Sequence, residues 1–452
     1  MFSKSKRTLG LILAGLTVVS AFAACAPAGE GDTKGTTKAK EDEKPKVQSY
    51  SVDDVLGDAK IAMADEDNVK LKVWAPQAAL KVFQKECDDF AAAMKKLDKT
   101  VEIEVVALGE ADASSQLITD ASVAADVLGF ASDQGLNIFK AGLAAPVRQQ
   151  FVQPIVDSNL KGSTDTIMFK GPDDAEELLY AYPSTGDNGY VLYYDKRVLK
   201  EEDAKTLEGI LKVAEKEDKT FSMNMGNGYF GCMIPFTGGG TLAMEEDLET
   251  QKLNYDYDKI GPVAMAFAEK LTGCSKFISD DVDKTIVSGF KNGTYLGGVT
   301  GTWKAKDIEK ALGENMGAIK LPTINVDGED KQIITMFGYK NLAVNAQSKF
   351  PVTAQSLAYY LSSEECQKER FEEAGWGPSM TSLVESDEIQ NDTVLKAIYA
   401  QQEFSVPQKD IVPVWWDPTG AFSGYCANPT EDHSEKEMKK QYDTMVQVIE
   451  AG

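Results

Sequence analysis

Aromatic side chains beside polar residues are the first feature of this sequence with a clear chemical use. Rings stand next to Gly, Pro or polar residues, near expected strand ends and turns, at Phe130, Tyr229-Phe230, Trp303, Trp376, Trp415 and Trp416. Such a ring suits a sugar, because it covers C–H faces while neighbouring Asp, Asn and Gln bind hydroxyl groups. Packing is the ordinary explanation for any single Trp, so only the group predicts a carbohydrate site.

Paired carboxylates allow a second chemistry. Glycoside hydrolysis uses two carboxyl groups about 5–10 Å apart, and Asp133 with Asp187 is the pair to test. The chain has 71 Asp and Glu residues, so pairs are available without any enzymatic meaning. We therefore expect no catalytic residues, and an exported glycoside hydrolase stands as the alternative from another functional class.

Several other chemistries lack the residues they need. A single His in 452 residues removes metal sites built from paired histidines. The glycine run 238–240 is not followed by the Lys-Ser/Thr of a phosphate loop, and the acidic runs 280–283 and 327–330 lack the ligand spacing of an EF-hand. We expect no cofactor and no metal.

Charge and length limit the partners and the architecture. Against the 71 acidic residues stand 47 Lys and Arg, for a formal net charge of −24, which repels nucleic acid. The length allows two or three domains, and 43% hydrophobic residues can fill their cores. Five cysteines beyond residue 25 are scattered without a C-x-x-C pair, which favours buried thiols over a disulfide framework: Cys87, Cys232, Cys274, Cys366 and Cys426.

The first residues have the features of an export signal. Basic residues at Lys4, Lys6 and Arg7 precede an apolar stretch over 9–24, which is short for a membrane span. The stretch ends in Phe-Ala-Ala-Cys at 22–25, which resembles a bacterial lipobox. The resemblance implies a signal peptide over 1–24, a lipid on Cys25 and attachment to the outer face of the cell membrane. Simple secretion with an incidental cysteine is the alternative.

The composition after Cys25 predicts a tether and then a folded region. Residues 25–67 are rich in Gly, Thr, Lys, Glu, Asp and Pro, which indicates a flexible acidic and polar segment that favours a Gram-positive surface over a periplasm. From residue 69, apolar alternation predicts strands at 69–74, 101–105 and 127–130, and spacings of three and four predict helices at 80–97 and 117–121. This order indicates a parallel α/β sheet, with ligands beyond the carboxyl ends of its strands.

The same alternation continues to the end of the chain. Expected strands lie at 190–194, 295–299 and 342–344, and expected helices at 207–214, 357–361, 366–374 and 438–449. With about 380 residues to fold, two α/β lobes of comparable size are the natural division.

Several stretches together resemble the extracellular solute-binding proteins of ABC sugar importers, in particular the maltose/maltodextrin-binding branch. They extend over residues 69–452 and include Leu71-Lys72-Val73-Trp74, residues 125–134, Tyr182-Pro183, Tyr194-Asp195-Lys196, Tyr229 to Pro235, Phe290-Lys291-Asn292-Gly293, Thr300-Gly301-Thr302-Trp303 and Leu342-Ala343-Val344-Asn345.

This resemblance implies a two-lobed fold of the periplasmic-binding-protein type, with parallel-type sheets flanked by helices and a ligand cleft between the lobes. We expect an N-terminal lobe from residues 68–186 plus 342–388 and a C-terminal lobe from 187–336 plus 394–452. Hinge crossovers are expected near 184–189, 337–341 and 386–393.

The resemblance also implies the ligand-binding residues. Phe130, Tyr229 and Trp303 fall at ring positions that stack on sugars, and Asp133 at a hydroxyl-binding position. The full set is Phe130, Asp133, Gln134, Asp187, Asn188, Asn227, Tyr229, Trp303, Tyr339, Trp415, Trp416 and Phe422. This sequence departs from the branch at 76–79, where Pro-Gln-Ala-Ala replaces an Asp-Lys pair. That difference leaves the preferred chain length or linkage open.

The expectation is therefore a monomeric lipoprotein that captures malto-oligosaccharides by ring stacking and hydrogen bonds, closes at its hinge, and delivers them to the membrane subunits of an ABC permease. The alternative within the same class is another oligosaccharide, such as a β-linked or galactose-containing one.

Overall fold

The structure is a computed structural model that describes residues 66–171, 176–245 and 248–451. The expected signal peptide, Cys25 and nearly all of the expected tether lie outside these ranges. Within the described ranges, no helix combines the length and the apolar character needed to cross a membrane.

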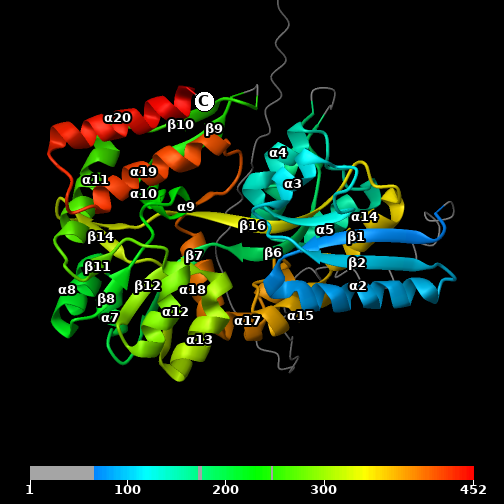
Figure 1. Cartoon of the computed structure of the whole chain (residues 1–452), viewed down its shortest axis with the longest axis horizontal. Helices are drawn as coiled ribbons and strands as arrows, with labels where there is room; N and C mark the ends of the chain where they lie inside the picture. Colours follow the sequence, from blue (N-terminus) through cyan, green and yellow to red (C-terminus); the bar gives the residue numbers. More distant parts are fainter. Residues whose placement is uncertain (1–65, 172–175, 246–247, 452) are drawn as a thin grey trace, which may run out of the picture. The chain divides into compact units, whose positions relative to one another are not determined.

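The first sheet begins with the three strands that the sequence predicts (Figure 1). β1 (Val69–Ala75) pairs in parallel with both β2 (Val101–Ala107) and β3 (Val127–Ala131). The connections contain α2 (Leu80–Lys95) and α3 (Ala113–Thr119). The apolar face predicted for α2 is buried, so strand alternation and helical spacing both identified the core side of these elements.

The sheet as a whole is mixed rather than parallel. Its order is β17-β16-β3-β1-β2, with β6 also paired to β16. β16 (Thr335–Val344) runs antiparallel to β3 and to β6 (Tyr182–Asn188), and parallel to β17 (Ser405–Pro407). The parallel arrangement predicted for β1, β2 and β3 is confirmed. Apolar alternation marks a strand but not its direction, so the antiparallel pairing of β16 could not be read from the sequence.

The second sheet has the order β11-β8-β12-β7-β13. β7 (Tyr190–Asp195) lies inside it and is antiparallel to β12 (Tyr295–Gly301) and β13 (Met316–Ile319). The side chains of β7 alternate between two apolar clusters on opposite faces, as expected for a strand covered on both sides. β8 (Thr220–Ser222) and β11 (Phe277–Ile278) complete the sheet.

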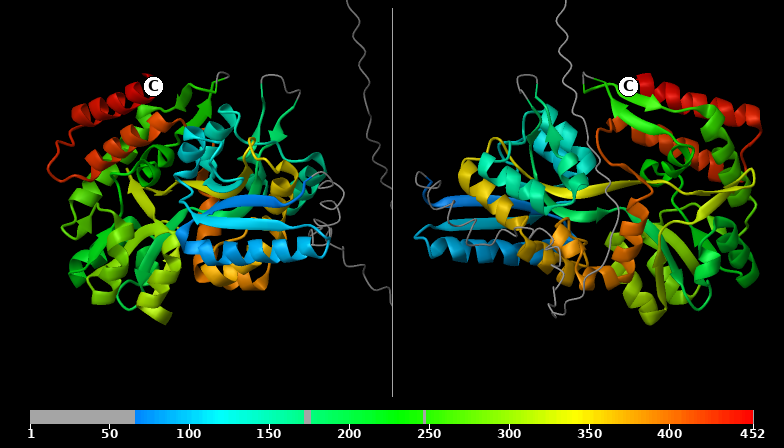
Figure 2. Two further views of the ribbon diagram at one scale, coloured as in Figure 1. Left: turned by 45° about the vertical axis from the view of Figure 1, so that its right-hand side comes forward. Right: turned by 180° about the vertical axis from the view of Figure 1, so that it is seen from behind.

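Helices and short hairpins surround the two sheets (Figures 1 and 2). The remaining helices are α4 (Gly135–Lys140), α5 (Gln149–Ser158), α6 (Lys161–Asp165), α7 (Glu201–Ala204), α8 (Leu207–Glu217), α9 (Gly228–Gly231), α10 (Met233–Thr237), α11 (Tyr257–Thr272), α12 (Val282–Asn292), α13 (Ala305–Leu312), α14 (Pro351–Leu361), α15 (Glu364–Ala374), α16 (Thr381–Val384), α17 (Asp387–Asn391), α18 (Thr393–Gln402), α19 (Trp416–Ala427) and α20 (Glu435–Ala451).

Three antiparallel hairpins lie apart from the main sheets. They are formed by β4 (Met168–Phe169) with β5 (Leu178–Leu179), β9 (Thr241–Met244) with β10 (Gln251–Asn254), and β14 (Thr323–Val326) with β15 (Glu329–Gln332). The 3₁₀ turns that matter for the site are η2 (Ser132–Gln134), η3 (Thr302–Lys304) and η5 (Pro413–Trp415).

The buried apolar residues form separate clusters around the two sheets. We call the part of the chain around the first sheet the N-terminal lobe and the part around the second sheet the C-terminal lobe. One cluster draws on residues 69–182 and 342–383, and two others cover the faces of the second sheet. The chain passes between them from β6 to β7, along β16, and between α16 and α18. We propose these passages as the hinge, at the boundaries that the sequence predicts.

All five cysteines within the described ranges are free and buried. Cys87 and Cys366 belong to the N-terminal core, and Cys232, Cys274 and Cys426 to the C-terminal core. The interpretation of these residues as small buried hydrophobes is confirmed.

Candidate functional site

A pocket of about 370 Å³ is lined by residues from both lobes and from the strand that links them. Its lining comes from η2 after β3, the end of β6, the segment after β8, η3 after β12, and the start of α19. In most of these cases a strand ends and the chain turns at the pocket, which is where an α/β fold presents ligand-binding groups.

Three aromatic rings form one wall. Tyr229 of α9 lies 6.3 Å from Trp303 and 6.5 Å from Trp416, measured between ring centroids. All three rings are half-buried, and each lines the pocket. A partly exposed group of rings is able to pack against the apolar faces of a sugar.

Close backbone approach fixes two of these rings. A Cβ on Gly301, the last residue of β12, would lie 2.1 Å from the indole of Trp303. A Cβ on Gly228 would lie 2.2 Å from the carbonyl oxygen of Trp416. Glycine at position 301 leaves room for the ring of Trp303, and glycine at position 228 leaves room for the backbone of Trp416. A side chain at either position would push these groups away. The indole Nε1 of Trp303 also donates to Asp283 Oδ2 at 2.7 Å.

The polar part of the lining, which we call the polar wall, is held by side-chain hydrogen bonds. Asp133 of η2 accepts from Gln134 Nε2 at 2.7 Å and from Gln408 Nε2 at 2.9 Å. Gln408 Oε1 in turn accepts from Asn188 Nδ2 at 2.9 Å. Burial raises the pKa of the Asp133 carboxyl to about 6, because the charged form loses its hydration.

Seven of the twelve predicted ligand-binding residues line this pocket: Asp133, Gln134, Asn188, Asn227, Tyr229, Trp303 and Trp416. They are separated by up to 283 residues in the chain, between Asp133 and Trp416. Asn227 has a local role as well, since its Oδ1 accepts from the backbone N–H of Tyr229 at 2.9 Å and caps α9.

The structure does not bring the other five to the pocket surface. Phe130 is buried in the N-terminal core and Phe422 in the C-terminal core. Trp415 is fully buried, stacked on Phe236 at 5.9 Å. Tyr339 is buried, and its hydroxyl accepts from Gln402 Nε2. The fifth is Asp187, whose Oδ2 accepts from the backbone N–H of Gly377 at 2.9 Å. The sequence could not separate these residues from the ones that line the pocket, because polar neighbours in sequence do not reveal which ring a helix or strand turns inward.

The carboxylate pair proposed for hydrolysis is divided by this arrangement. Asp133 lines the pocket, whereas Asp187 is only 1% exposed and is absent from the lining. A hydrolytic pair needs both carboxyl groups beside the scissile bond, and the described structure offers only the first of these two. Within the described ranges there is also no cluster of three or more His, Cys, Asp or Glu suited to a metal ion.

Two residues that line the pocket were missed by the sequence reasoning. Gln408 and Asp417 both line the pocket. Asp417 directly follows Trp416, so its proximity to a ring was a usable signal. Gln408 lies in an irregular segment after the three-residue strand β17, and no periodicity or motif marks it.

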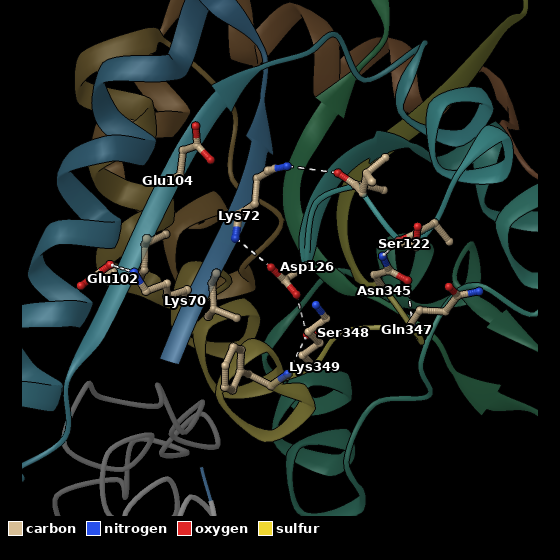
Figure 3. Close-up of a pocket in the computed structure, with 16 residues that line it drawn as sticks. Lys70, Lys72, Glu102, Glu104, Ser122, Asp126, Asn345, Gln347, Ser348 and Lys349 are labelled. Atoms are coloured by element: carbon tan, nitrogen blue, oxygen red, sulfur yellow. Dashed lines mark hydrogen bonds and ion pairs between the residues drawn. The ribbon is translucent and has the colours of Figure 1, made fainter. Parts of the chain in front are cut away.

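A second pocket, of about 510 Å³, lies at the amino-terminal half of β1 and β2 (Figure 3). Several of its polar groups bind one another. Asp126 accepts from the backbone N–H of Lys72 and from Ser348 Oγ, and Lys70 pairs with Glu102 at 2.9 Å. Phe350 is the one ring in the lining of this pocket, so we propose the cleft with three rings as the binding site.

Comparison with known proteins agrees with a two-lobed binding-protein fold. The sequence model of the bacterial extracellular solute-binding protein family matches residues 80–397, and the chain belongs to this family. A galactooligosaccharide-binding protein of Bacillus subtilis is 31% identical over 122 residues. That match covers 27% of this chain and only 28% of the relative.

Solved structures match over most of the chain. One described as a complex with acarbose has a TM-score of 0.75 and 26% identity, covering 84% of this chain and 98% of the other. The maltodextrin-binding protein MalE1 of L. casei has a TM-score of 0.71 at 21% identity, covering 85% of this chain and all of the other. The maltose-maltodextrin-binding protein of Alicyclobacillus acidocaldarius has a TM-score of 0.68 at 19% identity, covering 84% and 99%. At these last two identities the likeness establishes the fold.

Proposed function

We propose that this protein captures oligosaccharides outside the cytoplasm for an ABC importer, with malto-oligosaccharides as its first substrate class, and that it binds them without catalysis. The observation that carries the proposal is the cleft itself, with three rings on one wall and a carboxylate held by amides on the other. Rings bind the C–H faces of a sugar, and the polar groups bind its hydroxyls.

The position of the cleft supports a closing motion. Asp133 and Gln134 belong to the N-terminal lobe, Tyr229, Trp303 and Trp416 to the C-terminal lobe. A sugar that contacts both walls stabilises the closed state, because only that state offers both sets of contacts. A permease that recognises the closed form then receives loaded protein preferentially.

The substrate class rests on two different supports. The similar structures described with acarbose, maltodextrin and maltose favour an α-glucan. The Bacillus subtilis relative named for galactooligosaccharide supports the second candidate, a galactose-containing oligosaccharide.

Isothermal titration of the protein with maltotriose, a β-galacto-oligosaccharide and xylotriose separates these candidates. We expect saturable maltotriose binding in the micromolar range, about −8 kcal/mol, with no new products after prolonged incubation. Binding of the galacto-oligosaccharide alone would replace the substrate and keep the role. Release of shorter sugars, lost in Asp133→Asn, would instead favour the hydrolase.

We further propose that Cys25 carries a lipid and anchors the protein to the cell membrane, on the evidence of the lipobox-like residues 22–25. Expression of the wild type and Cys25→Ala in a Gram-positive host tests this. We expect the wild type in the membrane fraction, with the mass of an added lipid, and the variant in the medium. Release of both into the medium would leave simple secretion as the explanation.

A further inference from the structure

Gln408 occupies the junction between the polar wall and the strand that links the lobes. Its amide makes two side-chain hydrogen bonds of 2.9 Å, donating to Asp133 Oδ1 and accepting from Asn188 Nδ2. It is 4% exposed and still lines the cleft. One side chain thus connects η2 of the N-terminal lobe to the end of β6, through a segment that follows β17.

The chemistry of the partners fixes the orientation of this amide. An ionised carboxylate only accepts hydrogen bonds, so the NH₂ group of Gln408 must face Asp133 and its oxygen must face Asn188. The second oxygen of Asp133 accepts from Gln134. Both carboxylate oxygens therefore hold one amide donor each, and lone pairs remain on both for the hydroxyl groups of a ligand.

The backbone of Gln408 is fixed as well. Its N–H donates to Phe337 O at 2.8 Å, and its carbonyl accepts from Ser132 Oγ at 2.8 Å. A Cβ on Gly338 of β16 would lie 2.0 Å from Gln408 Oε1. Glycine at this point of β16 leaves room for the amide beside the linking strand.

Among the residues that the structure describes, no Lys or Arg lines the cleft to neutralise Asp133. The neighbouring Lys409 donates instead to Met168 O at 3.3 Å. Two other titratable residues, Tyr229 and Asp417, line the same cleft. Glu110 precedes the lining residue Ala111 and pairs with Lys340 at 3.6 Å, and burial raises the pKa of the Glu110 carboxyl. Amide donors are thus the groups that hold this buried carboxylate in place.

We propose that Gln408 is a positioning residue of the binding cleft: it holds the Asp133 carboxylate in the orientation that receives ligand hydroxyls and couples that orientation to the linking strand β6 through Asn188. This inference rests on the proposed function. It adds a residue outside the twelve that the sequence predicts, and it makes the polar wall dependent on a donor at residue 408.

The variant that tests the proposal is Gln408→Glu. A carboxylate at this position still accepts from Asn188 but has no hydrogen for Asp133, so two negative charges would face each other at about 3 Å, unless they share a proton. Gln153→Glu is the matched control, because the amide of Gln153 also donates to a carboxylate, that of Asp157 at 2.7 Å, on the exposed surface.

The measurement is maltotriose affinity by titration calorimetry at pH 7.5 and pH 5, each variant compared with the wild type at the same pH. We expect Gln408→Glu to bind at least tenfold more weakly at pH 7.5 and within about threefold of the wild type at pH 5, since the shared proton restores the donor. Gln153→Glu should match the wild type at both pH values. Equal affinity of Gln408→Glu and wild type at pH 7.5, or a loss that does not change with pH, would overturn the proposal.

A ligand-free measurement separates this inference from the proposed function. The Asp133 carboxyl can be titrated by carbon-13 NMR in the wild type and in Gln408→Leu, which removes the donor without adding charge. Loss of a hydrogen bond to the charged form should raise the pKa of Asp133 by about 1 unit. An unchanged pKa would overturn the positioning role even if no oligosaccharide binds, whereas a raised pKa without any sugar binding would reject only the proposed function.

Discussion

The two walls of the cleft are built by different physical means. The aromatic wall is positioned by backbone approach and apolar packing, with Gly301 under Trp303 and Gly228 under Trp416. The polar wall is positioned by a series of hydrogen bonds that includes a buried carboxylate. A ligand meets rings in the first wall, whose contacts do not change with protonation, and a carboxylate in the second wall, whose contacts do. The comparison teaches that both walls contribute affinity, whereas the pH response of the ligand contacts comes from the polar wall.

Removing the indole ring of Trp303 from the aromatic wall should have the largest effect. We expect Trp303→Ala to weaken maltotriose binding by ~1–3 kcal/mol, because a buried stacking contact is lost. Trp303→Phe keeps a ring and should retain most of the affinity. Titration calorimetry with circular dichroism as a check on folding measures both. Unchanged affinity in a folded Trp303→Ala would remove this wall from the binding site.

Changing the carboxylate of the polar wall should move stability and affinity in opposite directions. The pKa of Asp133 is raised to about 6, so the folded state favours the protonated form and loses stability as pH rises from about 4 through 6. Asp133→Asn removes this cost and should raise the melting temperature at pH 7.5 by roughly 1–5 °C, with no gain at pH 4. Its sugar affinity should fall.

Asp417→Asn is the matched control for this stability effect. Asp417 lines the same cleft but is exposed, so its charge is hydrated and its removal should leave the melting temperature unchanged. Thermal unfolding of the three proteins across pH 4–8 measures the difference. A rise in both variants would indicate general relief of negative charge rather than burial of one carboxylate.

The effect of pH on binding should be smaller than the effect of Trp303→Ala, and we expect it to come from the polar wall alone. Below pH 6, protonation of Asp133 replaces an acceptor with a donor, and maltotriose affinity should fall by no more than tenfold per pH unit. Asp133→Asn should flatten the profile, and Trp303→Phe should lower it without changing its shape. A profile that keeps its slope in Asp133→Asn would assign the titration to another group.

The smallest expected effect is at the contact between the walls. Tyr229 Oη donates to Asn188 O at 3.3 Å, a long hydrogen bond. We expect Tyr229→Phe to reduce affinity by about 1 kcal/mol or less, because the ring remains. A loss as large as that of Trp303→Ala would mean that the hydroxyl, rather than the ring, binds the sugar.

The sequence predicted the elements of the fold better than their directions. Strands β1, β2 and β3 and helix α2 followed from apolar spacing because burial selects residues by side-chain direction. The antiparallel course of β16 did not follow, since a hydrogen-bonded partner of either direction produces the same pattern. Two apolar lobes were expected from length and alternation, and the separate cores agree with that expectation.

Predicted residues line the pocket where residue type and a local turn coincide, and the sequence missed a lining residue where contacts between distant segments decide its position. Trp303 and Asp133 follow strands directly, so their place at a strand end could be read from the chain. Trp415 and Trp416 are adjacent, yet one is buried and the other lines the cleft, because helix geometry separates neighbours onto different faces. Gln408 depends on contacts to Asp133 and Asn188, 275 and 220 residues away.

The buried thiols have a practical consequence. Burial raises the pKa of Cys87 and Cys426, so each stays a thiol and reacts only when its surroundings open. Cys366 lies with Cys87 in the N-terminal core and Cys232 lies with Cys426 in the C-terminal core. The rate at which each cysteine reacts with a thiol reagent therefore measures how often its lobe unfolds locally. A bound sugar that holds the lobes together should slow the reaction of the cysteines in both lobes.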